Sequence, residues 1–348
     1  MLAASGVIIE NHDVSEPTRN RSHILEAYVR KALVIGIDDY PGYPLTGCVN
    51  DAKAVAETLE SHGDGEPNFE VKLITSPGED SSNNGITRSR LKAEVESLFS
   101  GDPEVALFYF SGHGMMKSLG GFIITSDHTK YDEGVSMDDI LKFANQSKAK
   151  DKVIILDCCH SGAFGSPTIT GNNLSYLCEG LSVLTASRDS ESAIEANGSG
   201  VFTSLVIDAL KGGAADLRGQ ITPGSIYAFV DQALGPWDQR PIFKTNVTGS
   251  TFLRTIPPPV PKATLRKLVE YFPQPDVELK LGPEYETTHA SKDLAKVAIM
   301  EHLQKFVSVG LVVPVGEEHM YFAAINSKSC RLTAIGRQYW RLVKGKHL

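Results

Sequence analysis

Four short apolar runs constrain the fold of this chain most strongly. They occupy residues 31–37, 105–110, 153–156 and 181–185. Each lacks the alternation of polar and apolar positions that is typical of a strand with one solvent-exposed face, so each is expected to be buried on both faces. Such strands are typical of parallel sheets covered by helices. Residues 69–74 alternate more, and we expect that strand nearer an edge.

Helix-like stretches separate these runs. They cover residues 51–61, 87–99, 138–144, 202–210 and 223–234. Thr87 is a plausible N-cap for the second of them, because its hydroxyl can accept from a free backbone N–H. Residues 240–244 favour a last strand, which Pro241 would place at an edge. The alternation predicts an α/β fold with a mostly parallel sheet, flanking helices and right-handed crossovers.

The chain is expected to divide into four parts. Residues 1–29 are polar and weakly patterned, which suggests an N-terminal arm, and residues 30–256 form the α/β domain. Residues 257–262 are rich in proline and predict a stiff linker. In residues 263–348 we expect helices at 263–271, 292–309 and 333–343, and a hairpin formed by 311–314 and 320–325. Helices with a small hairpin resemble a winged-helix domain.

Composition narrows the functional class. The net charge of −8 divides unevenly: residues 257–348 hold 13 Lys+Arg against 9 Asp+Glu, and the rest holds 21 against 33. An acidic body suits cationic substrates better than nucleic acid. No apolar run approaches the roughly 18 residues of a membrane helix. The first residues lack the features of a signal peptide, so a cytoplasmic protein is expected.

The number and spacing of the five cysteines do not indicate a shared structural role. They are Cys48, Cys158, Cys159, Cys178 and Cys330. Their odd number and scattered spacing do not fit a disulfide framework, and no CxxC pair or His-Cys cluster indicates zinc. Reduced thiols are expected, and one of them is available as a nucleophile.

Two of the predicted strands end in reactive groups. The first is followed by Gly112-His113-Gly114, and the second by Asp157-Cys158-Cys159. Active sites of open α/β sheets lie at the carboxyl ends of strands. His113 and Cys159 are 46 residues apart, so one crossover between neighbouring strands would bring them together. An imidazole beside a thiol generates the thiolate that a cysteine peptidase needs.

Each of these residues also has a plainer explanation. A histidine after a buried strand is often a satisfied turn residue, and a buried cysteine is often an apolar filler. Neighbouring residues of an extended chain face opposite ways, so only one of Cys158 and Cys159 can face His113, and position alone does not choose. A vicinal disulfide between them is an alternative. His160 is a rival base, but it adjoins Cys159 and is poorly placed to take its proton.

The two motifs carry a family resemblance. Tyr109-Phe-Ser-Gly-His-Gly114 and Asp157-Cys-Cys-His-Ser-Gly162 resemble the catalytic motifs of metacaspases and orthocaspases, which are caspase-like cysteine peptidases. The resemblance spans about residues 30–255. It implies that Cys159 is the nucleophile, that His113 is the base, and that the amides of Gly114 and Cys159 form the oxyanion hole. The spacing also agrees with a caspase-type histidine roughly 50 residues before the cysteine.

The resemblance extends to substrate specificity. Gly47-Cys-Val-Asn-Asp-Ala52 looks like the family segment that supplies part of the primary specificity pocket. Carried over by position, the pocket residues are Asp51, Asp157, Cys48 and Ser111. Two carboxylates would hold the guanidinium or ammonium group of a P1 Arg or Lys and repel a P1 Asp. The plainer explanations are a helix N-terminal charge for Asp51 and a histidine-orienting carboxylate for Asp157.

No cofactor is required for this chemistry, but many metacaspases need calcium. Oxygen ligands are available from Asp127, Asp138 and Asp139, together with Asp132 and Glu133. Their spacing is not that of an EF-hand, and an acidic loop is usually only solvated. Lys130, Lys148 and Lys150 are candidate sites of self-cleavage.

We therefore expect an Arg/Lys-specific cysteine endopeptidase in a signalling, stress or defence pathway. Two alternatives stay open: a caspase-like scaffold that acts through residues 263–348, and another cysteine hydrolase such as an amidase. The last 21 residues carry six Lys and Arg and no acid. The charge of residues 263–348 is nevertheless modest, so a regulatory protein partner is favoured over DNA.

Overall fold

The structure is a computed structural model. It describes residues 29–77, 85–117, 120–129, 132–158, 176–186, 195–196, 199–234, 240–249 and 251–348. The expected N-terminal arm therefore lies almost wholly outside the described residues, as do Lys130, Cys159 and His160.

A six-stranded sheet forms the centre of the larger part of the molecule, in the order β12-β8-β7-β3-β1-β2. The strands are β1 (Arg30–Ile37), β2 (Glu70–Ser76), β3 (Val105–Ser111), β7 (Asp151–Asp157), β8 (Leu181–Thr185) and β12 (Ile242–Asn246). All neighbouring pairs are parallel except β12 with β8. The mostly parallel α/β sheet expected from the sequence is confirmed.

The apolar runs occupy the interior of this sheet. Every residue of β3, β7 and β8 is buried, whereas β2 and β12 expose part of their length. β2 and β12 are the two edge strands of the sheet. The sequence predicted both positions, that of β2 from its alternating polar and apolar residues and that of β12 from Pro241 just before it.

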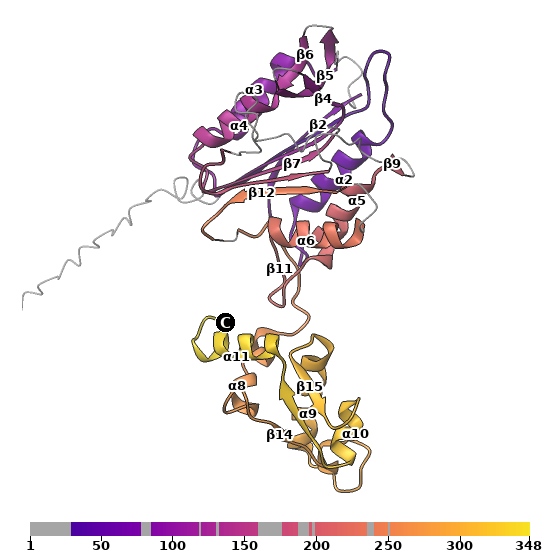
Figure 1. Cartoon of the computed structure of the whole chain (residues 1–348), viewed down its shortest axis with the longest axis vertical. Helices are drawn as coiled ribbons and strands as arrows, with labels where there is room; N and C mark the ends of the chain where they lie inside the picture. Colours follow the sequence, from indigo (N-terminus) through magenta and orange to yellow (C-terminus); the bar gives the residue numbers. More distant parts are fainter. Residues whose placement is uncertain are drawn as a thin grey trace, which may run out of the picture.

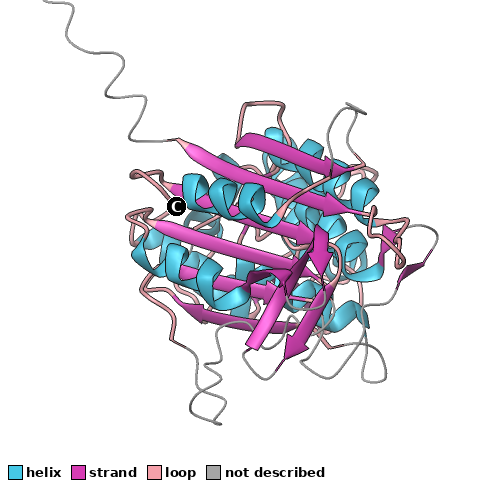
Figure 2. Ribbon diagram, turned by 90° about the horizontal axis from the view of Figure 1, so that it is seen from above, coloured by secondary structure: helices cyan, strands magenta, loops and turns pink. Residues whose placement is uncertain are grey.

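Helices cover both faces of the sheet (Figures 1 and 2). They are α2 (Cys48–Glu60), α3 (Arg88–Leu98), α4 (Met137–Gln146), α5 (Val201–Asp208) and α6 (Pro223–Leu234). The side chains of α3 and α4 pack in one core, and those of α2, α5 and α6 pack in a second core on the opposite face. Thr87 caps α3 as expected, with its hydroxyl 3.3 Å from the backbone nitrogen of Arg90.

Small strands that the sequence analysis did not identify lie around the main sheet. A three-stranded antiparallel sheet follows β3 directly, and two short pairs lie farther along the chain. These strands are β4 (Gly114–Lys117), β5 (Gly120–Thr129) and β6 (Asp132–Ser136), then β9 (Glu195–Ala196) with β10 (Ser199–Gly200), and β11 (Gln220–Ile221) with β13 (Arg254–Thr255). The three-stranded sheet matters for function because it begins beside His113.

The residues after the proline-rich segment form a third core around a three-stranded sheet in the order β14-β16-β15. The elements are α7 (Lys262–Leu265), α8 (Leu268–Tyr271), β14 (Leu279–Lys280), η3 (Pro283–Tyr285), α9 (Leu294–Ser308), β15 (Val312–Val315), α10 (Met320–Ile325), β16 (Ser329–Leu332) and α11 (Ala334–Lys344). Figure 1 shows this part joined to the larger one near β11. The winged-helix resemblance stays a prediction.

Two expected elements of this part are wrong. Residues 320–325 form a helix rather than a strand, because Met320, Ala323 and Ala324 lie on one helical face and are buried. The antiparallel partner of β15 is instead β16, in which Arg331 is exposed between buried neighbours. The helix expected at 263–271 is interrupted at Arg266 and Lys267 and appears as α7 and α8.

Among the described residues, no helix has both the length and the apolar character that a membrane span requires.

Candidate active site

The two reactive strand ends lie side by side. β3 pairs with β7 so that Ser111 is opposite Asp157. The backbone N–H of Gly112 donates to the carbonyl of Asp157 at 3.3 Å, which ties the two ends together just beyond the sheet. The sequence prediction that His113 lies beside the end of the cysteine-bearing strand is therefore correct.

Cys158 is not available at this edge. Its side chain is fully buried in the core that also contains α3 and α4. The sequence left Cys158 and Cys159 as alternatives, and a side chain buried in this core cannot reach a substrate at the edge of the sheet. Cys159 itself lies outside the described residues, so its role as nucleophile stays a prediction.

The imidazole of His113 is held through one of its two nitrogens. Its Nε2 lies 2.8 Å from the backbone carbonyl oxygen of Tyr43. A carbonyl can only accept a hydrogen bond, so Nε2 must carry the proton. In the neutral ring, Nδ1 is then the basic nitrogen, the one that can take a proton from a thiol.

A tight turn places the Tyr43 carbonyl. Residues Tyr40, Pro41, Gly42 and Tyr43 form this turn, and the N–H of Tyr43 donates to the carbonyl of Tyr40 at 3.1 Å. Gly42 has a φ of 85°, which fits a type II turn with Pro at its second position and Gly at its third. The sequence analysis missed this segment. The Pro-Gly pair marks a turn, but nothing local indicates that the turn faces His113.

The two predicted pocket carboxylates converge on Gly200. Asp51 and Asp157 are 3% and 6% exposed. A Cβ at Gly200 would lie 3.1 Å from Oδ2 of Asp51 and closer still to Oδ2 of Asp157. The N–H of Gly200 donates to Asp51 at 2.9 Å. The structure thus brings together two acids that are more than 100 positions apart in the chain.

A relay of hydroxyl groups orients Asp157. Thr203 donates to its Oδ2 at 2.6 Å, and the phenol of Tyr109 lies 2.6 Å from the Thr203 hydroxyl. Since the Thr203 proton goes to the carboxylate, Tyr109 is the donor to Thr203. Burial, with the nearby charges of Asp157 and Asp51, raises the pKa of Tyr109 well above its usual value. Sequence reasoning missed Thr203 and Gly200, which come from a distant segment.

The other predicted pocket residues, Cys48 and Ser111, are also buried, at 5% and 2% exposure. Cys48 begins α2, and its N–H donates to the carboxylate of Asp38 at 2.8 Å. Asp38 thereby caps the helix that carries Asp51. Ser111 ends β3 directly before the His113 loop.

The Gly114 amide points away from its neighbouring strand. The N–H of Ile124 donates to the carbonyl of His113 at 3.0 Å, so His113 and Ile124 form a hydrogen-bonded pair. Pairs alternate along an antiparallel ladder, and the next pair is Gly114 with Ile123. The Gly114 N–H therefore does not bond to β5, as an oxyanion-hole donor requires.

Three of the candidate calcium ligands have protein partners in the structure. Asp127 accepts from the backbone N–H of Arg88 at 3.0 Å, and Asp132 pairs with the Arg88 side chain. Asp139 pairs with Lys92 at 3.0 Å. Within the described part of the chain, no three His, Cys, Asp or Glu side chains group as a metal site would require. Calcium dependence stays a prediction.

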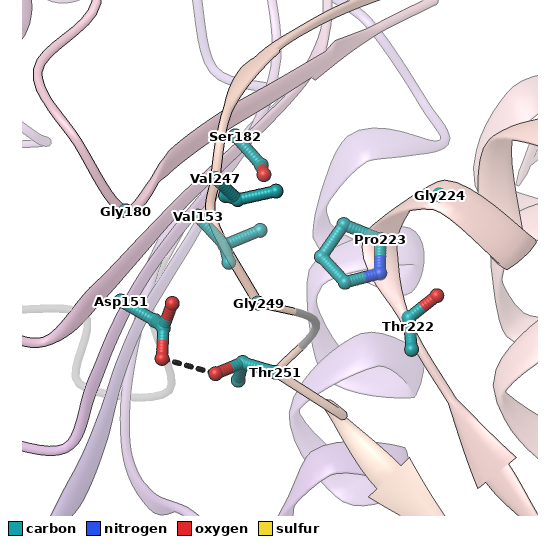
Figure 3. Close-up of a pocket in the computed structure, with 10 residues that line it drawn as sticks. All are labelled: Asp151, Val153, Gly180, Ser182, Thr222, Pro223, Gly224, Val247, Gly249 and Thr251. Atoms are coloured by element: carbon teal, nitrogen blue, oxygen red, sulfur yellow. Dashed lines mark hydrogen bonds between the residues drawn. The ribbon is translucent and has the colours of Figure 1, made fainter.

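One surface hollow lies at the other end of the sheet (Figure 3). It is lined by the start of β7, including Asp151 and Val153, and by Thr222 and Pro223 at the start of α6. The carboxyl ends of the strands, where ligands of such sheets bind, are elsewhere. We therefore do not place the substrate in this hollow. The exposed lysines Lys148 and Lys150 also precede the start of β7.

Comparison with protein families gives a match to the model of the caspase domain over residues 29–252. No curated protein matches the chain. Among solved structures, a protein from Geobacter sulfurreducens overlaps with a TM-score of 0.47 and 17% identity, covering 66% of this chain and 98% of its own. Caspase-1 from Spodoptera frugiperda overlaps with a TM-score of 0.48 and 13% identity, covering 66% and 92%. Both structural likenesses are weak.

Proposed function

Because the chain belongs to the caspase domain family, we propose that it is a cysteine endopeptidase that cuts proteins after arginine or lysine. The observation that carries the P1 preference is the convergence of Asp51 and Asp157 on Gly200, beside the strand ends that carry His113 and lead to Cys159.

In the proposed reaction, Nδ1 of His113 takes the proton of the Cys159 thiol. The thiolate attacks the substrate carbonyl, and the Gly114 amide with the Cys159 amide stabilises the resulting oxyanion. His113 then returns its proton to the leaving amine, and water hydrolyses the thioester. The Tyr43 carbonyl, at 2.8 Å from Nε2, stabilises the imidazolium that forms between these steps.

Two carboxylates select a cation for both energetic and geometric reasons. A charge-assisted hydrogen bond contributes about 1.5–3 kcal/mol, and a guanidinium presents several donors to a carboxylate pair. A P1 aspartate would add a third negative charge to the same buried space. We propose that Cys48 and Ser111 line the pocket beside the carboxylates.

The first test compares fluorogenic peptides that differ only at P1. We expect cleavage after Arg and Lys and none after Asp. The Cys159→Ala variant should lose activity. The matched Cys158→Ala variant should keep it, because Cys158 is a core residue. Running the assay with and without a calcium chelator decides the calcium prediction in the same experiment.

The results would contradict the proposal in distinct ways. Efficient cleavage after Asp would exclude the acidic pocket. Full activity of Cys159→Ala, with loss of activity in Cys158→Ala, would show that Cys158 is the nucleophile. Absence of any peptide cleavage would favour the scaffold alternative.

We further propose that residues 263–348 bind a regulatory protein and that the enzyme works in a cytoplasmic signalling, stress or defence pathway.

A further inference from the structure

We propose that the hydroxyl group of Tyr40 positions the catalytic base. Tyr40 lies in the turn that follows β1 and is 2% exposed. Its hydroxyl accepts a hydrogen bond from the backbone N–H of His113 at 3.0 Å. Its ring lies 4.6 Å from the imidazole of His113, at an angle of 56° between the planes. This assignment rests on the proposed function of His113.

The hydroxyl replaces a missing bond of the β-ladder. His113 and Ile124 form a hydrogen-bonded pair, in which two reciprocal backbone bonds are normal. The Ile124 N–H donates to the His113 carbonyl, but the His113 N–H donates to Tyr40 instead. Tyr40 in turn lies 3.4 Å from the Ile124 carbonyl. The phenol therefore bridges the two groups just where the base is attached.

Room for the hydroxyl comes from Gly112. A Cβ at that position would collide with the Tyr40 oxygen and would lie 2.7 Å from Cζ of Phe110. Only glycine leaves this space open. Gly112 thus admits a side chain from another loop.

The same turn therefore fixes His113 from two sides. The Tyr40 side chain holds its backbone nitrogen, and the Tyr43 carbonyl holds Nε2 of its ring. Burial raises the pKa of Tyr40 well above its usual value, so the phenol keeps its proton across the working pH range. The next amide along the chain is that of Gly114, so a shift of His113 would also move the oxyanion-hole donor.

The test is the Tyr40→Phe variant, which removes one oxygen and keeps the ring against His113. Displacement of a catalytic group by about 1 Å costs on the order of 100-fold, so we expect kcat to fall about 10- to 100-fold. KM for the P1 arginine peptide should change less than about twofold, because the pocket carboxylates are untouched. The control is Tyr227→Phe, whose ring stacks on Phe243 on the face of the sheet that α6 covers, and which should keep full activity.

A second readout does not depend on activity. In protein labelled with 13C-histidine, the Hε1 signal of His113 is identified by its loss in His113→Gln. Tyr40→Phe should shift this signal, and Tyr227→Phe should not. An unchanged kcat with an unshifted signal would overturn the proposal. A fall in the kcat of Tyr40→Phe that only matches the unfolded fraction measured by circular dichroism would overturn it as well. If the wild-type chain cleaves no P1 Arg or Lys peptide, the proposed function fails, and the shift of the His113 signal still decides the positioning role.

Discussion

At the scale of single residues, we attribute the proposed P1 preference to the negative charges of Asp51 and Asp157. Replacing either carboxylate by its amide keeps the size of the side chain and removes the charge. We expect Asp51→Asn and Asp157→Asn each to lower kcat/KM for P1 arginine peptides about 10- to 100-fold, the value of one charge-assisted hydrogen bond. Cleavage rates for a panel of P1 residues measure the effect.

Asp276→Asn is the control for removal of a negative charge away from the pocket. Asp276 is exposed and lies in the carboxyl-terminal part of the chain. This variant should leave P1 preference unchanged. Undiminished preference for arginine in both pocket variants would mean that Asp51 acts only as an acidic charge in the first turn of α2 and that Asp157 only orients neighbouring groups.

At the scale of elements, the start of α2 depends on a carboxylate from outside the helix. Asp38 follows β1 and accepts from the N–H groups of Cys48 and Val49, at 2.8 and 3.3 Å. Loss of a capping side chain usually costs about 1 kcal/mol of stability. We expect Asp38→Ala to lower the free energy of unfolding by about that amount, as measured by urea denaturation.

Asp39→Ala provides the matched control, because Asp39 is the exposed neighbour of Asp38 and its substitution makes the same change in charge. It should change the free energy of unfolding by less than about 0.5 kcal/mol. Equal destabilisation by the two variants would show that net charge, rather than the cap, is responsible.

At the scale of the whole molecule, the chain contains two regions with separate cores. The sheet and its helices share the cores on their two faces, and residues 260–332 supply the buried side chains of the third core. Leu217, in the loop before β11, packs against this third core. We expect two thermal transitions in the calorimetry of the full chain.

Glu286 allows the transition of the third core to be identified. It is 7% exposed, and its Oε1 has no hydrogen-bond partner among the described residues. Burial raises its pKa from the ordinary value of 4.5. The folded form therefore binds the proton more tightly than the unfolded chain does. The free energy of unfolding falls as pH rises from about 4.5 through the folded-state pKa of Glu286. Above that pKa the full loss of stability is reached.

We therefore expect Glu286→Gln to raise one of the two transition temperatures by a few degrees at neutral pH, with the gain fading below about pH 4.5. Glu301→Gln, on the exposed side of α9, should shift neither transition. A single cooperative transition, or a gain that persists at low pH, would contradict this account.

The sequence by itself determined the sheet and the place of its reactive end. Continuous apolar runs such as 105–110 and 153–156 can be stable only when both faces are covered, and alternation with helices makes their carboxyl ends meet at one edge. The resemblance of residues 47–52 and 157–162 to family segments also predicted that Asp51 and Asp157 line one pocket. The sheet and its reactive end follow from local pattern, whereas the pocket residues follow from the family resemblance.

Only the tertiary structure decided what holds the site in place. Tyr40, Tyr43, Gly200 and Thr203 act through contacts with residues at least 46 positions away. No local propensity distinguishes a turn that faces His113 from one that faces solvent. The second strand expected in the carboxyl-terminal hairpin was wrong for a related reason. Residues 320–325 are too short for periodicity to decide, and the packing of Met320, Ala323 and Ala324 made them a helix.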